Sequence, residues 1–284
     1  MKRYKALAVK AQYWKPNADY ISKMVAALKG KVQDGDIVVV SEKAISTAIG
    51  NIVDESVVKP SLTACFLAKY WMRYVWAYVL GPLCRLRKRA ILHFRNYPIQ
   101  EGSAHKQVAL QYCGFLQALM HSSEGGIDGS NLPYSYVSLL LNNSYRVTER
   151  IRCSIEAELD KNVGVMIVDT DKTYSWRNFH FTPRPKPIKG ILSVGSFLSY
   201  IVARVLNLKR RSTPLALAGI SMGIEEALEV AELADRARGF GAGRTIWSMA
   251  ETFNVSLTGV SWKMLEETEH RPIVVVRSIH FVRV

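Results

Sequence analysis

Two aspartates lie at positions where a strand or hairpin gives way to a loop, and their carboxylates are candidates for a functional site. Asp128 lies in the glycine-rich segment GGIDGSN, and Asp169 precedes Thr170 at the end of the apolar run VMIVDT. Loops that follow strands and hairpins often carry function because a rigid scaffold holds them. Carboxylate and hydroxyl oxygens are the ligands that Mg²⁺ prefers. The pattern predicts a hard-cation site, with an Asx-turn at Asp128 and a capped turn at Asp169 as the structural alternatives.

Two familiar site signatures are missing from the sequence. It contains no GxxxxGK[ST] phosphate loop, and its six histidines form no HExxH pair. The segment GFGAGR (239–244) follows a helical pattern rather than a strand, and it does not complete GxGxxG. A nucleotide site in this protein is therefore not expected to be a P-loop.

The amino-acid composition indicates which class of molecule the protein binds, but it says little about the fold. Lys and Arg number 38 against 24 Asp and Glu, so the formal net charge is +14, and the pI is about 9.7. Such a surface attracts nucleotides, phosphorylated metabolites, nucleic acid or acidic lipid. With 49% hydrophobic and 22% charged residues, the chain is expected to be globular rather than disordered.

The four cysteines and the N-terminal residues indicate the compartment. Cys65, Cys84, Cys113 and Cys153 are widely spaced, which predicts reduced thiols rather than a zinc site or a disulfide framework. The first residues, MKRYKALAVKAQYW, contain no continuous apolar stretch of the kind that a secretory signal needs. A cytoplasmic protein is predicted.

The hydrophobic pattern predicts the elements that would position these residues. Buried strands are predicted in GDIVVVSEK (35–43), at 163–170 and in HRPIVVVRS (270–278), and a short apolar segment occupies 5–10. The segment 106–120 is interpreted as a hairpin around Cys113-Gly114. Strands and helices do not alternate as regular βαβ units, so an α+β fold with a mixed sheet and extra helical segments is expected. Helical spacing occurs at 21–30, 146–159, 198–206, 224–237 and 246–253.

An aromatic segment from 62 to 80 is long enough to be compared with a membrane span. Lys69 and Arg73 share one helical face near its middle, where each would cost about 2.5 to 3.5 kcal/mol in a bilayer. A buried or interfacial helix that ends at Gly81-Pro82 is therefore favoured. The basic run RLRKR (85–89) that follows is either a solvated face or a docking surface for an anion or a membrane.

Four segments together resemble one protein family. SEKAISTAIG (41–50), GGIDGSNLP (125–133), VMIVDT (165–170) and PIVVVR (272–277) are similar to motifs of the γ-glutamyl ligases that add glutamate to the deazaflavin coenzyme F420. These segments occur in the same order as in the family. The resemblance covers most of the chain except about 60–105 and 185–262. The resemblance implies a divergent, archaeal-type member with one catalytic unit over 1–284, in which those two ranges are insert-like, and it implies a homodimer.

The resemblance also implies an activity and its residues. A GTP-dependent ligase would join L-glutamate to an acidic small-molecule acceptor through an acyl phosphate, with Mg²⁺ or Mn²⁺ as cofactor. Lys43, Asp128 and Asp169 would be catalytic. The metal ligands would be Asp128, Asp169, Thr170 and Glu266, with Glu267 as the alternative to the last. The nucleotide contacts would be Ala11, Gln12, Tyr13, Trp14, Glu42, Lys43, Thr47 and Asn131. Tyr13 or Trp14 would either stack on the purine or pack in the hydrophobic core.

Departures from the family pattern leave other functions open. The family usually reads S-K-x-E-G-R where this chain has Thr47, Ile49 and Asn51 in place of Lys, Glu and Arg. The family's D-x-x-G-R segment after the Asp-Thr strand has no clear match, and a basic stretch over 183–262 is interpreted as helix-rich. A ligase-like protein with another acceptor or no turnover is one alternative. A basic protein that binds nucleic acid or a membrane surface through 70–95 is the other.

Overall fold

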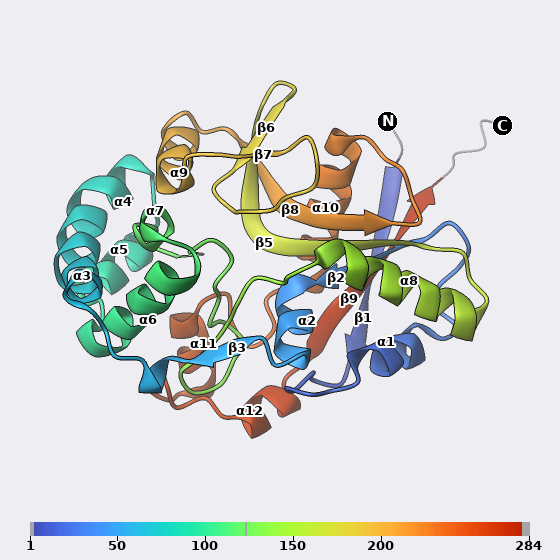
Figure 1. The fold of residues 1–284 in the computed structure, drawn as a ribbon, viewed down its shortest axis with the longest axis horizontal. Helices are drawn as coiled ribbons and strands as arrows, with labels where there is room; N and C mark the ends of the chain where they lie inside the picture. Colours follow the sequence, from blue (N-terminus) through green and yellow to red (C-terminus); the bar gives the residue numbers. More distant parts are fainter. Residues whose placement is uncertain (1–2, 123, 280–284) are drawn as a thin grey trace.

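The three predicted buried strands and the short apolar segment at 5–10 pair side by side in one mixed sheet. The computed structural model describes residues 3–122 and 124–279. Its main sheet has the order β1-β9-β2-β5-β6-β7, and β8 also pairs with β5 (Figure 1). The strands span β1 (Arg3–Ala11), β2 (Ile37–Ser41), β5 (Gly164–Trp176), β6 (Phe179–Thr182), β7 (Leu192–Ser193), β8 (Lys209–Ala218) and β9 (His270–Ile279). The α+β, mixed-sheet prediction is confirmed.

The parallel pair β2 and β5 determines where the two chemistry-bearing segments meet. Ile37 lies opposite Gly164, and Ser41 lies opposite Val168. Strands that run in the same direction end at the same edge of a sheet. The residues after Ser41 and the aspartate after Val168 are therefore neighbours, although more than 120 residues separate them in the sequence.

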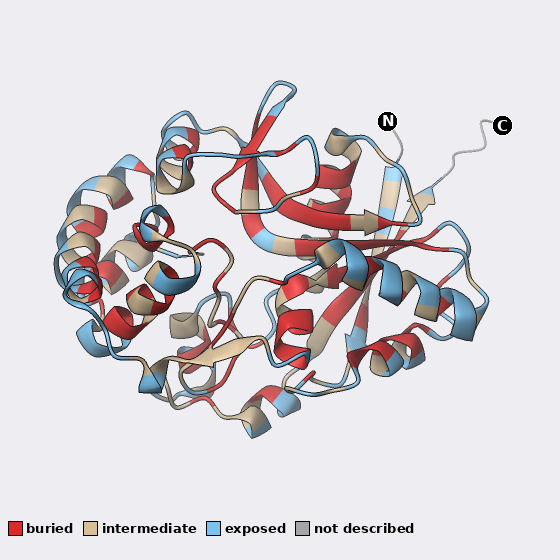
Figure 2. Cartoon of the chain, in the orientation of Figure 1, coloured by how far each residue is buried: buried red, intermediate tan, exposed pale blue. Residues whose placement is uncertain are grey.

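Helices cover both faces of this sheet. Successive residues of β2 point to opposite sides, so Val38 and Val40 pack in one apolar core while Ile37 and Val39 pack in another. The first core is completed by α1 (Tyr20–Leu28), α2 (Glu42–Ala48) and α8 (Ser144–Leu159), and the second by α10 (Ile224–Arg238). The buried residues follow the strands and the inner helix faces (Figure 2).

A group of helices lies beside the sheet, at the left of Figure 1, and has its own core. Trp76, Met72 and Phe94 are buried there against Tyr97. The group consists of α3 (Leu62–Phe66), the π-helical segment η2 (Leu67–Leu80), α4 (Gly81–Leu83), α5 (Lys88–Arg95), α6 (Ile99–Tyr112) and α7 (Phe115–Ala118). The remaining elements are β3 (Ile52–Asp54), η1 (Glu55–Val57), β4 (Tyr136–Ser138), α9 (Ser196–Val205), α11 (Ile246–Phe253) and α12 (Trp262–Glu267).

The hairpin predicted over 106–120 is wrong, because this segment forms the second half of α6 and all of α7. Its apolar residues pack on one helical side, where Val108 and Ala109 join the core with Leu67. Gly114, predicted as the turn of a hairpin, instead terminates the helix with a positive φ of 91°, and its N–H donates to Ala109. The segment contains residues with high helix propensity, which agrees with its helical structure.

The predicted end of the aromatic helix at Gly81-Pro82 is also wrong. The helix continues through α4 and ends at Cys84, where Arg85 follows with a φ of 53°. The Gly81 N–H donates a hydrogen bond to the carbonyl of Trp76, five residues earlier. Pro82 lies in the first turn of α4, where the lack of a backbone N–H is tolerated. None of the helices in the described residues has the length and apolar character needed to cross a bilayer.

The stretch over 183–262 contains a strand in addition to its helices. β8 is antiparallel to β5 and pairs with it from Lys209 to Ala218. Pro214 obscured this strand in the sequence, since proline donates no ladder hydrogen bond and argues against a strand. In the structure Pro214 lies opposite Val168, directly at a shift of register. The irregular pairing accommodates the proline.

Replacing Trp76 by alanine tests the core of the helical group. The Trp76 ring is fully buried, and its indole N–H donates to the Leu119 carbonyl at 2.8 Å. We expect Trp76→Ala to lower the free energy of unfolding in urea by about 3 to 5 kcal/mol, because it leaves a large cavity. Tyr74→Ala, on the exposed side of the same helix, is the control and should cost about 1 kcal/mol or less. Equal losses in the two variants would contradict this packing.

Candidate functional site

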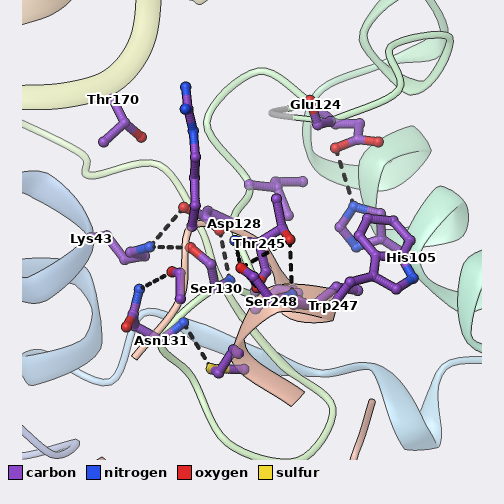
Figure 3. A pocket seen from close by; sticks show the side chains of 18 of the residues that line it. Lys43, His105, Glu124, Asp128, Ser130, Asn131, Thr170, Thr245, Trp247 and Ser248 are labelled. Carbon is purple, nitrogen blue, oxygen red and sulfur yellow. Dashed lines mark hydrogen bonds and ion pairs between the residues drawn. The ribbon is translucent and has the colours of Figure 1, made fainter. Parts of the chain in front are cut away.

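Asp128 and Lys43 meet beside the end of β2. The Lys43 ammonium lies 2.7 Å from Asp128 Oδ2 and donates to Ser130 Oγ at 2.6 Å (Figure 3). The Ser130 N–H donates to Asp128 Oδ1 at 2.7 Å, which closes an Asx-turn. Backbone hydrogen bonds between Asp128 and Ser138 fix the loop from the other side. Asp128 therefore combines the structural turn with a charged contact to Lys43.

Lys43 affects the ionisation of Asp128. Burial alone would raise the pKa of this carboxyl group. The adjacent ammonium of Lys43 and the hydrogen bonds from Lys43 and Ser130 outweigh burial and hold the pKa below its ordinary value. The carboxylate is therefore ionised at neutral pH.

Asp169 lies beside a buried arginine that the sequence analysis did not identify. The Arg184 guanidinium is 2% exposed, and it forms ion pairs with both Asp169 and Glu42. The turn between β5 and β6 brings the chain back, so that Arg184 reaches an aspartate 15 residues earlier. No motif in the sequence marks Arg184, because its contacts with Asp169 and Glu42 arise only when the chain folds.

Asp169 lies within β5 rather than at its end. The strand continues to Trp176, and its pairing with β8 is irregular between Asp169 and Lys172. Bulges of this kind redirect side chains next to functional sites. Thr170 follows at the bulge, with its hydroxyl 3.5 Å from Asp169 Oδ1.

A cavity of about 1260 Å³ opens onto this cluster. Its walls come from the sheet edge, the helical group and the loops around α11. The predicted site residues that line it are Tyr13, Trp14, Lys43, Thr47, Asp128, Asn131, Asp169 and Thr170. The cavity thus brings together residues from four separate parts of the sequence.

Four other predicted residues do not line the cavity. Ala11 ends β1 and Gln12 follows it, while Glu42 is buried behind Lys43 and accepts from the Leu141 N–H at 2.8 Å. Glu266 lies on α12 and pairs with Lys15 at 2.6 Å. Within residues 3–122 and 124–279, no group of three or more His, Cys, Asp or Glu side chains is arranged to hold a metal ion.

Three of the predicted nucleotide contacts are engaged within the protein. Asn131 holds the GFGAGR loop: its Oδ1 accepts from the Ala242 N–H at 2.7 Å, and its Nδ2 donates to Gly243 at 2.9 Å. Gly241 has a φ of 58°, and a Cβ there would lie 2.6 Å from Asn131 Oδ1. The Tyr13 hydroxyl donates to the Asn131 carbonyl, and Thr47 Oγ1 donates to the Lys43 carbonyl at 2.8 Å.

Trp14 is fully buried, and its ring contacts Tyr20 and His270. Its indole nitrogen has no hydrogen-bond partner among the described residues, and the same is true of His270 Nε2. Burial lowers the pKa of His270 to about 3, so this imidazole is neutral. Two residues whose rings are in contact and that both line the cavity therefore each carry an unsatisfied polar atom.

A second charged cluster was missed because it lies partly in the segment interpreted as a hairpin. Lys106 is fully buried and pairs with Glu124 at 2.7 Å. His105 lies between Glu55, at 2.7 Å, and Glu124, at 3.2 Å. Glu124 precedes the GGID segment, so this cluster fastens the Asp128 loop to α6.

The segment GISMG (219–223) has the G-x-S-x-G spacing of a nucleophile elbow, contrary to the expectation that no such elbow is present, and it connects β8 to α10. β8 is antiparallel to β5, so it ends at the sheet edge opposite to Asp169. Ser221 is exposed and does not line the cavity, and the positive φ lies at Gly219. The segment is a strand-to-helix turn and lacks the partners of a nucleophile elbow.

Removal of the buried ammonium should destabilise the protein strongly. We expect Lys106→Met to cost about 3 kcal/mol or more in the free energy of unfolding, because Glu124 then loses a buried partner. The double variant Lys106→Met/Glu124→Gln should recover part of this loss. Lys10→Met removes the exposed pair with Glu269 and should cost about 1 kcal/mol or less. A Lys106→Met variant as stable as Lys10→Met would rule out this role.

His105 should make the stability depend on pH. Burial lowers its pKa, but Glu55 and Glu124 outweigh burial and raise it from 6.5 to about 10. A raised pKa contributes stability in full below 6.5, and this contribution disappears as the pH rises through about 10. The difference in unfolding free energy between wild type and His105→Gln should therefore shrink across that interval. A difference that stays constant over the titration would contradict the assignment.

Comparison with known proteins agrees with the geometry. The family description F420-0:gamma-glutamyl ligase matches residues 8–194. An uncharacterised protein of Methanocaldococcus jannaschii is 36% identical over 285 residues, which cover 96% of both chains. The coenzyme F420:L-glutamate ligase of the same organism is 31% identical over 139 residues, 49% of each chain. The chain belongs to the F420-0:gamma-glutamyl ligase family and is an enzyme of the ligase class.

Proposed function

We propose that the protein is a GTP- and divalent-metal-dependent amide ligase that adds L-glutamate to a phosphorylated carboxylate acceptor such as coenzyme F420-0. The observation that carries the proposal is the convergence of Lys43, Asp128, Asp169 and Thr170 on one cavity. These residues come from three segments of the chain, and two of the three carry predicted carboxylate ligands. The family and its named relative support glutamate as the amine.

The oxygen donors fit a hard cation that is shared with phosphate. Magnesium is usually held by one or two carboxylates together with substrate phosphates, rather than by an all-protein cage. Asp128, Asp169 and Thr170 would hold such an ion, and Glu266 is engaged with Lys15 instead. A bound cation supplies neutralisation of phosphate charge. The protein's own cations, Lys43 and Arg184, keep the two carboxylates paired until the substrates bind.

The unsatisfied nitrogens of Trp14 and His270 support a nucleobase site. Buried polar groups are normally hydrogen-bonded, so a pair without partners at a cavity wall favours a polar ligand there. A purine offers both donors and acceptors on its edges. Lys43 lies on the same cavity and carries the charge that triphosphate oxygens require.

The proposed reaction proceeds in two balanced steps. A carboxylate oxygen of the acceptor attacks the γ-phosphorus of GTP, and the bond to the β-phosphate oxygen breaks with release of GDP. The glutamate nitrogen then attacks the acyl carbon, phosphate leaves with the electron pair of the acyl C–O bond, and the nitrogen loses a proton. Phosphoryl transfer depends mainly on positioning and charge neutralisation, for which Lys43 is placed. The ionised Asp128 keeps that ammonium oriented.

A ligase-like protein with a different acceptor, or without turnover, is the second candidate. Asn51 replaces the family's usual arginine, and its Nδ2 donates to the carbonyls of Leu139 and Leu140. Asn51 therefore hydrogen-bonds to the protein backbone and carries no charge at this position. Binding of nucleic acid or a membrane surface stays an alternative, and association into a homodimer stays a prediction.

Asp169→Asn and Lys43→Met test the proposal. Each should lower kcat/KM for GTP-dependent glutamate addition by about 100-fold or more, because a charged group at the reacting phosphate is lost. The measurement is amide formation with F420-0, together with calorimetric binding of GTP in the presence of Mn²⁺. Asp34→Asn, an exposed aspartate outside the cavity, is the control and should match wild type. Wild-type rates in both site variants would refute the proposal.

A further inference from the structure

Four exposed aromatic side chains form a row along one side of α3 and η2. Phe66, Tyr70, Tyr74 and Tyr78 follow one another at intervals of four residues, and side chains with this spacing are neighbours on a helix. The centroids of consecutive rings lie 5.4, 6.3 and 6.5 Å apart, and each residue is 45% to 59% exposed. Contiguous exposed apolar surface of this kind marks an interaction site. We call these four residues the aromatic row.

The segment that contains the aromatic row carries positive charge and no negative charge. Between Glu55 and Glu101 the sequence has eight Lys or Arg residues and no Asp or Glu, so this segment supplies +8 of the formal net charge of +14. The eight cations are Lys59, Lys69, Arg73, Arg85, Arg87, Lys88, Arg89 and Arg95. Within the described residues, Arg89 is the one member of this set that forms an ion pair, with Glu251. A surface with one sign of charge favours a partner of the opposite sign.

Two of these cations lie directly beside the aromatic row. The Lys69 ammonium is 5.1 Å from the centroid of the Tyr70 ring, and the Arg95 guanidinium carbon is 4.7 Å from the centroid of the Tyr78 ring. Both cations are exposed. Apolar rings and positive charges are therefore presented together on one surface, and a partner that offers apolar material beneath anionic groups complements both.

The position of the aromatic row favours an extended partner over one that needs a groove. Figure 1 shows α3 and α4 at the outer edge of the helical group, and none of the four rings lines a cavity in the described part of the chain. Single-stranded nucleic acid is usually held in a positively charged groove. Leu62, four residues before Phe66, and Val79 add exposed aliphatic side chains, which offer no aromatic face for a base. A lipid surface accommodates aliphatic and aromatic side chains alike.

We propose that the aromatic row is a docking surface for an anionic lipid membrane. The rings enter the region of the lipid headgroups, where tyrosine is favoured because its ring is apolar and its hydroxyl is polar. Lys69 and Arg95 lie beside the rings and attract the negative charge of the headgroups. The inference is independent of the proposed ligase function, because the aromatic row lies outside the cavity.

Binding of the full chain to lipid vesicles, measured by co-sedimentation, tests the role of charge. Vesicles of equal parts phosphatidylglycerol and phosphatidylcholine should bind the chain about tenfold or more tightly than vesicles of phosphatidylcholine alone, which carry no net charge. Lys69→Gln/Arg95→Gln should weaken binding to the anionic vesicles by about tenfold. Arg146→Gln/Arg150→Gln, at two exposed positions of α8, removes the same charge and should stay within about twofold of wild type.

A second pair of variants tests the rings without changing the charge. Tyr70→Gln/Tyr74→Gln should weaken binding to the anionic vesicles by about tenfold, because less apolar surface leaves water on docking. Tyr145→Gln/Trp176→Gln replaces two aromatic residues of similar exposure elsewhere and should stay within about twofold of wild type. All of these residues are exposed or half-buried, and the midpoint of urea unfolding of each variant shows that the fold is kept.

Three results would overturn the docking surface. The first is equal binding to neutral and anionic vesicles, and the second is wild-type binding in Lys69→Gln/Arg95→Gln and Tyr70→Gln/Tyr74→Gln. The third is binding of an oligo(dT) strand that is lost in these variants while vesicle binding is unchanged, which would assign the row to nucleic acid. The replaced residues lie outside the cavity, so GTP binding with Mn²⁺ should be the same in wild type and in every variant. Failure of wild type to bind GTP would count against the ligase proposal alone.

Discussion

The buried guanidinium of Arg184 is the interaction on which the site depends. It lies between Glu42, directly after β2, and Asp169 in β5, so it joins the two parallel strands at their functional edge. It also abuts Gly126, where a Cβ would lie 3.0 Å from the guanidinium. A buried ion pair is costly to desolvate, and it is tolerated where each charge is matched. Two carboxylates and one guanidinium thus hold the strand ends and the Asp128 loop in register.

The loop that carries Asp128 is held from two sides by charges of different character. On the sheet side, the contact between Lys43 and Asp128 is partly exposed and opens onto the cavity. On the helical side, Lys106 and His105 bind Glu124, whose side chain is almost fully buried. The first contact is therefore the more accessible of the two, while the second fixes the loop.

The sequence was sufficient to identify the central strands of the sheet and the loop aspartates, because strand-length apolar runs report burial directly. VMIVDT and PIVVVR became parts of β5 and β9, and Asp169, near the end of the first motif, lines the cavity. Contacts made by long-range packing were not predictable in this way. Arg184 reaches Asp169 only through the turn between β5 and β6, and Pro214 concealed β8 because its compensating bulge is a tertiary feature. The helix at 106–112 was missed because short apolar runs do not distinguish a buried helix from a strand.

The cavity walls include residues from 60–105 and 185–262 as well as from the sheet edge. Lys43, Asp128, Asp169 and Arg184 lie at the sheet edge, where each charge has a partner. Arg85 follows the aromatic helix and lies within the residues 8–194 that match the family, whereas Arg204 and Arg210 come from α9 and β8 beyond that match. A change in those segments alters the cavity without disturbing the pairing of β2 with β5. The pairing of the sheet-edge charges and the lining of the rest of the cavity therefore depend on separate parts of the chain.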